Sequence, residues 1–147
     1  MRAISFQILY DLAVKDVDEA FKAIVAADAR RKKAEEQLIR LQQYQYDYKR
    51  RLQQSMSEGV LSSQAQNDQK FISTMDDAIQ QQSNVLGQTQ KQVATERERW
   101  MVARRKVASM EALLKRDQKR QTLVAAKQEQ KANDEYAARA YRRLHAA

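Results

Sequence analysis

Few side chains in this sequence have the types and spacing that catalysis or metal binding requires. His145 is the only histidine and cysteine is absent, so neither a base beside a nucleophile nor a cluster of soft metal ligands is indicated. The adjacent carboxylates at positions 35–36 and 76–77 point away from each other if they lie on helices. No glycine-rich phosphate loop is present. We expect no enzyme activity, no cofactor and no bound metal.

The amino-acid composition indicates which secondary-structure elements carry these side chains. The 147 residues include no proline and only two glycines, Gly59 and Gly87. A sheet protein of this length needs many turns, and turns draw on glycine, proline and asparagine. The abundant residues are instead good helix formers. The sequence therefore favours one domain made of long helices or a coiled coil, and it excludes a disulfide scaffold.

One short segment, residues 57–63, interrupts the helical pattern. Gly59 can end a helix in the left-handed conformation. Ser63 followed by Gln66 fits a capping box that opens the next helix. We predict a helix over about residues 4–56, a turn over 57–62 and a second helix over about 63–140.

Apolar residues recur with a mean spacing of 3.5 residues in both predicted helices. Between Phe6 and Leu52, twelve of fourteen such positions are apolar or aromatic, where a 43% background gives about six; the exceptions are Arg31 and Gln45. In the second helix every seventh residue from Ile72 to Leu114 is apolar. The pattern predicts an all-α fold, an antiparallel coiled-coil hairpin. Four alanines then face four larger residues: Ala13, Ala20, Ala27 and Ala34 opposite Val107, Trp100, Val93 and Leu86.

The second helix is longer than the first, and its excess is basic. Beyond about residue 114 it has no partner, and a lone helix is only marginally stable in water. We expect this overhang to end in a frayed basic tail when free and to become ordered on binding. Residues 1–96 carry 13 basic and 13 acidic side chains, whereas residues 97–147 carry 14 and 6 and hold the entire net charge of +8. This indicates an acidic partner surface, although a solvated helix face accounts for it equally well.

Near the turn, apolar and aromatic residues exceed what a two-helix seam needs. Two sets of four residues, one on each predicted helix, have successive spacings of four, three and four residues. In antiparallel register they pair as 37 with 82, 41 with 78, 44 with 75 and 48 with 71. Exposed aromatic residues among polar ones suit a protein-binding site, and the alternatives are a broader core or a homodimer contact. We call this set the apolar strip: Gln37, Leu41, Tyr44, Tyr48, Phe71, Met75, Ala78 and Gln82.

Several segments carry a resemblance to a known family. They are Ala34-Glu35-Glu36-Gln37-Leu38, Leu41, the Tyr44-Gln45-x-x-Tyr48 run, Gly59, Ser62, Phe71-Ile72, Ala78-Ile79, Trp100 with the basic cluster after it, and Ala137-Ala138-Arg139-Ala140. In these residues the chain resembles the FliJ family of flagellar type III export proteins.

The resemblance implies an antiparallel coiled coil similar to the stalk subunit of rotary ATPases. Family members bind the hexameric export ATPase, bind the cytoplasmic domain of the export gate FlhA, and recycle export chaperones. It places gate and chaperone binding on the apolar strip. We expect the ATPase to contact the basic end, through Arg104, Arg105, Lys106, Lys115, Arg116, Lys119 and Arg120.

The sequence also bears on the cellular location of the protein and leaves alternative functions open. Residues 1–14 lack the features of a secretory signal, and the longest strictly apolar run, 23–27, is far shorter than the roughly 20 residues that span a bilayer. We expect a cytoplasmic protein, peripheral to the inner membrane at the flagellar base through its partners. The alternatives are the equivalent stalk protein of a virulence-type secretion system, a basic nucleic-acid-binding arm, and a structural homo-oligomer.

Overall fold

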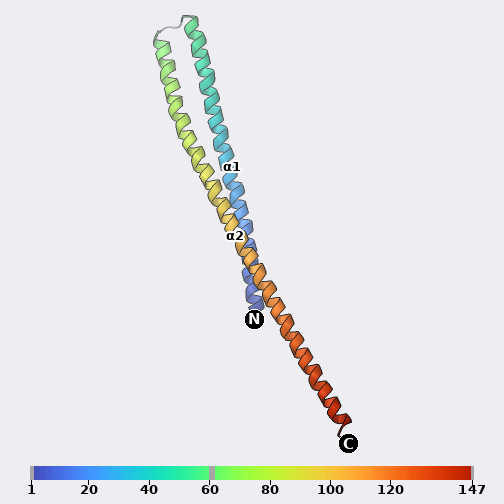
Figure 1. Cartoon of the computed structure of the whole chain (residues 1–147). Coiled ribbons are helices and arrows are strands. Elements are labelled where there is room, and N and C mark those ends of the chain that lie inside the picture. The colour runs from blue at the N-terminus through green and yellow to red at the C-terminus, as the bar shows by residue number, and fades with distance from the viewer. Residues whose placement is uncertain (1, 60–61, 147) are drawn as a thin grey trace. The chain divides into compact units, whose positions relative to one another are not determined.

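The computed structural model describes residues 2–59 and 62–146, with side chains from residue 5 onward. Two helices, α1 (Arg2–Ser57) and α2 (Ser62–Leu144), account for nearly all of them, and these ranges contain no strand (Figure 1). The two helices pack against each other. This confirms the all-α fold with two long helices. None of the described helices is long and apolar enough to cross a membrane.

The end of α1 shows why the helix stops where it does. Gly59 has a φ of 87°, a left-handed conformation that glycine adopts without steric cost. The amide of Glu58 donates to the carbonyl oxygens of Gln54 (3.3 Å) and Ser55 (3.1 Å). The prediction for Gly59 is confirmed. Helix α2 begins at Ser62, and residues 60–61 of the predicted turn lie outside the described residues.

The chain divides into two compact units, which we describe separately. One unit comprises Asp18–Met101, and the other comprises Met1–Val17 with Val102–Ala147. In the Asp18–Met101 unit, the two helices lie side by side in antiparallel directions (Figure 1).

The core of the Asp18–Met101 unit is a seam of small residues from α1 and larger ones from α2. Ala20, Ala27 and Ala34 are at most 4% exposed, as is Val93 on α2. Their seven-residue spacing brings each alanine to the same side of α1. Trp100, expected to anchor against this alanine face, is half-buried. The predicted alanine seam is therefore confirmed for these positions.

In the other unit, the first residues of α1 pair with the stretch of α2 that follows residue 102. Ala13 and Ala103 are buried, and the Tyr10 hydroxyl donates to Glu111 Oε1 at 3.2 Å. From Gln118 to Ala146 every described residue is exposed. Helix α2 thus continues well past its last half-buried residue, which confirms the overhang, and it remains helical as far as Leu144.

Candidate functional site

An aromatic pair joins the two helices within the apolar strip. The ring centroids of Tyr48 and Phe71 lie 4.5 Å apart with the planes tilted by 36°, so the predicted pairing of 48 with 71 is present. The Tyr48 hydroxyl donates to Asp68 Oδ1 at 3.2 Å. Partial burial, followed by the negative charge of Asp68, raises the pKa of Tyr48 above its ordinary value. Phe71 remains 47% exposed, so the pair leaves apolar area on the surface.

A glutamine pair closes the other end of the strip. Gln82 Nε2 donates to the backbone oxygen of Ala34 at 3.0 Å and to Gln37 Oε1 at 3.3 Å. The predicted pairing of 37 with 82 is therefore also present. Because Gln82 reaches the backbone of the opposite helix, it fixes the local register as well as contributing a polar surface group.

The remaining strip residues divide between surface and core. Tyr44 is 66% exposed, and Leu41 and Ala78 are half-buried. Met75 is only 8% exposed and belongs to the core. It lies three residues after Ile72, on the side of α2 that faces the seam, so its side chain supports the strip from beneath and does not lie on the surface.

The structure adds polar contacts that the sequence did not identify. Gln45 Nε2 donates to the Ile72 carbonyl oxygen at 3.3 Å and also contacts Asp76 Oδ1. Arg31 forms ion pairs with Asp28 at 2.8 Å and Glu35 at 2.7 Å. The hydrogen bond from Arg31 lowers the pKa of Asp28. The available signal was that Arg31 and Gln45 interrupt an otherwise apolar seam series.

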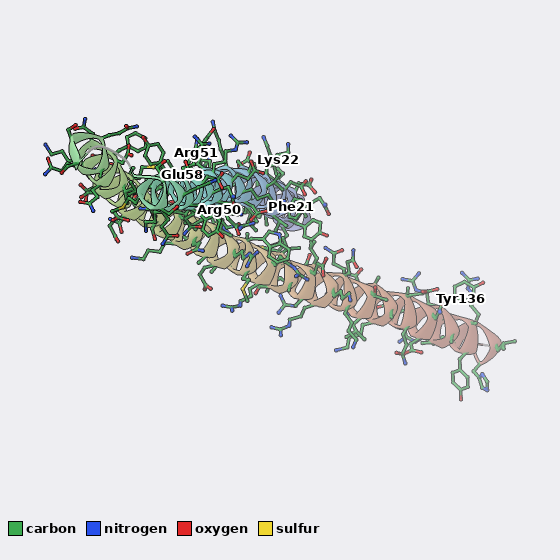
Figure 2. All side chains as sticks on the ribbon, turned by 90° about the horizontal axis from the view of Figure 1, so that it is seen from above. Phe21, Lys22, Arg50, Arg51, Glu58 and Tyr136 are labelled. Atoms are coloured by element: carbon green, nitrogen blue, oxygen red, sulfur yellow. The ribbon has the colours of Figure 1, made fainter. Side chains whose placement is uncertain are left out.

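The predicted basic end lies wholly in the other unit, on α2. All seven of its residues are exposed: Arg104, Arg105, Lys106, Lys115, Arg116, Lys119 and Arg120. Figure 2 shows side chains on both sides of this part of the α2 ribbon, and they continue as far as the labelled Tyr136. Cations held at this density on one helix attract an acidic surface and accelerate its association.

Neither surface is equipped for bond-making chemistry. Among the described residues, no group of three or more His, Asp or Glu side chains is placed to hold a metal ion. His145 stacks on Tyr141, with ring centroids 4.2 Å apart, at the exposed end of α2. The apolar strip and the basic end differ in character, since one exposes aromatic rings and the other exposes cations.

Comparison with known proteins identifies similar chains along nearly the whole length. The family model described as flagellar FliJ protein matches residues 1–145. The flagellar FliJ protein of Escherichia coli (strain K12) is 33% identical over 132 residues, which cover 90% of each chain. That of Salmonella typhi is 32% identical over 136 residues, which cover 92% of each chain. No solved structure shows significant similarity.

Proposed function

This chain belongs to the flagellar FliJ protein family, and from that premise we propose that it is a non-enzymatic, stalk-like partner of the flagellar export ATPase. Family membership makes it a component of the flagellar protein export apparatus. The observation that carries the proposal is the match over residues 1–145, which includes both candidate surfaces.

We propose that the basic end contacts the export ATPase hexamer. Support comes from the exposure of all seven basic residues and from the location of the whole net charge in residues 97–147. Lys and Arg side chains at such a contact steer an acidic surface into place and add affinity that falls with salt.

The apolar strip is proposed to bind the cytoplasmic domain of the export gate FlhA and export chaperones. Tyr44 and Phe71 expose much of their rings, and aromatic side chains are enriched at the centres of protein interfaces. Tyr48 and Met75 hold this surface in place, one through the ring contact and the other from the core. The protein would then act in the cytoplasm, held at the inner membrane beneath the flagellum through these partners.

Reciprocal variants test whether the two surfaces have separate partners. Triple charge reversal of Lys115, Arg116 and Lys119 to Glu should abolish binding of the purified ATPase and leave the FlhA cytoplasmic domain bound. Tyr44→Ala with Phe71→Ala should do the reverse. Tyr44 is largely exposed and Phe71 is about half exposed, so the helices should persist. Binding is measured by calorimetry, and circular dichroism checks helix content.

The matched control keeps the charge change and moves it along α2. Reversal of Arg139, Arg142 and Arg143 to Glu alters the net charge by the same amount outside the proposed contact, and should weaken ATPase binding far less. ATPase binding that survives the reversal at 115, 116 and 119 would refute the basic-end contact. FlhA binding that survives the loss of both aromatic side chains would refute the strip.

A further inference from the structure

One face of the α2 overhang combines cations with exposed apolar side chains. A shallow, open hollow on this face is lined by six residues: Arg116, Lys119, Arg120, Leu123, Val124 and Lys127. Leu123 is 59% exposed and Val124 is 49% exposed, so the structure leaves the apolar pair uncovered. The spacings of three and four residues place all six along one side of the helix.

Acidic residues flank this hollow but do not line it. Asp117 and Glu129 are absent from the lining of the hollow. Glu129 lies about 160° around the helix from Lys127, at 100° per residue. Asp117 lies at the edge of the face, about 20° from Val124, and accepts a hydrogen bond from Gln121 at 3.3 Å. Lys131, about 40° from Lys127, extends the row of cations, and Asp134, about 20° from Lys127, lies on the same side beyond it. The lining of the hollow therefore carries four cations and no carboxylate around an apolar pair.

We propose that this face docks directly on the anionic phospholipid headgroups of a membrane surface. The Lys and Arg side chains would contact lipid phosphates, with their aliphatic stems lying along the interface. Leu123 and Val124 would enter the boundary between headgroups and acyl chains, the arrangement of an amphipathic helix lying in the membrane plane. The helix is exposed on all sides from Gln118 onward, so no protein element blocks this approach.

Two features favour a lipid surface over nucleic acid as the anionic partner. The face has an apolar centre, whereas binding of nucleic-acid phosphates needs only the cations. None of its lining residues is aromatic, so it offers no platform for stacking bases. A lipid surface needs only charge complementarity and a narrow apolar contact, and this face provides both.

The proposed lipid contact shares part of its surface with the proposed ATPase contact. Arg116, Lys119 and Arg120 also belong to the proposed ATPase contact, so bound lipid and bound ATPase would compete for them. Leu123, Val124, Lys127 and Lys131 lie outside that contact. Substitutions restricted to these four residues test the lipid contact alone.

The test is flotation of the full chain with vesicles of stated composition. The chain should float with vesicles of phosphatidylcholine and phosphatidylglycerol in equal parts and not with phosphatidylcholine alone. Lys127→Glu with Lys131→Glu should weaken binding at least 25-fold, at about fivefold for each positive charge removed. Leu123→Ser with Val124→Ser should weaken it about tenfold through the lost apolar contact.

Matched controls separate this face from net charge and general hydrophobicity. Arg139→Glu with Arg143→Glu makes the same charge change about 120° and 160° around the helix from Lys127, and should weaken binding less than about threefold. Tyr136→Ser removes an exposed apolar ring outside the hollow and should change nothing. Equal losses of vesicle binding in the Lys127→Glu, Lys131→Glu variant and in the Arg139→Glu, Arg143→Glu control would overturn the proposal.

Other outcomes would also overturn it. The proposal would be overturned if the chain did not float with anionic vesicles. It would also be overturned if the Leu123→Ser, Val124→Ser variant bound them fully, because the apolar pair would then contribute nothing to binding. Tighter binding to single-stranded RNA, lost in the same lysine variant, would assign the face to nucleic acid. ATPase binding measured in parallel keeps the two proposals distinct, since lost lipid binding with retained ATPase binding removes only this inference.

Discussion

The ring contact between Tyr48 and Phe71 permits a quantitative prediction about stability. Phe71 is 47% exposed, so about half of its roughly 200 Å² is covered, which at about 25 cal/mol per Å² corresponds to at most about 2.5 kcal/mol. Alanine retains part of that coverage and the unfolded chain buries some of it. We expect Phe71→Ala to lower the free energy of unfolding by about 1.5 kcal/mol.

Tyr48→Ala should cost more than this, because it also removes a hydrogen bond. The hydroxyl contact to Asp68 contributes about 1 kcal/mol in typical cases. The double variant should then be less destabilised than the sum of the two single variants. A coupling of about 0.5–1.5 kcal/mol is expected for aromatic rings in contact.

Urea unfolding followed by circular dichroism at the helix band measures all four proteins of the cycle. Tyr46→Ala is the matched control, because Tyr46 lies on α1 near Tyr48 and is exposed; its effect should stay below about 0.5 kcal/mol. If the losses of unfolding free energy in the two single variants add up to the loss in the double variant within error, the ring contact is contradicted. A control as damaging as Tyr48→Ala would contradict the burial on which the magnitude rests.

Four further results are expected. Met75→Ala should lower the free energy of unfolding by about 2–4 kcal/mol, because the side chain is buried; a urea midpoint equal to wild type would place it on the surface. Gly59→Ala should cost about 1 kcal/mol in the same assay through its positive φ, and a neutral effect would argue against the left-handed turn. Because the pKa of Tyr48 is raised in the folded chain, the contribution of Tyr48 to the free energy of unfolding should be complete below the ordinary tyrosine pKa of about 10 and should decline as the pH rises through the folded pKa. Tyr48→Phe should remove that decline. Identical pH profiles of stability for the two proteins would refute the prediction. Backbone amides of residues 118–144 should exchange with solvent far faster than those of the seam, because that stretch is exposed throughout, and hydrogen exchange with slow rates there would count against fraying.

The fold could be predicted because its determinants are local or periodic. The seven-residue spacing of the alanines identified the buried face of α1, and Gly59 marked the end of that helix by its own conformational freedom. The length of the overhang followed from the unequal helix lengths on either side of that turn. None of these inferences needed the exact register of the two helices.

The candidate site was harder to predict, because surface and core differ there by small rotations about the helix axis. Met75 satisfied the spacing of both the seam and the strip, and only the packed structure assigns it to the core. The contacts of Gln45 with Ile72 and Asp76 depend on the register between the two helices. The spacing of apolar residues in the sequence defines that register only to within three or four residues. A polar residue in a seam series is the signal that such a contact exists, although it does not name the partner.

The most direct test of the account is ATP hydrolysis by the purified flagellar export ATPase as this chain is titrated in. We predict stimulation that saturates at a single chain per hexamer and is lost when Lys115, Arg116 and Lys119 are reversed to Glu. An unchanged hydrolysis rate, together with separate elution of chain and ATPase from a sizing column, would contradict the stalk assignment.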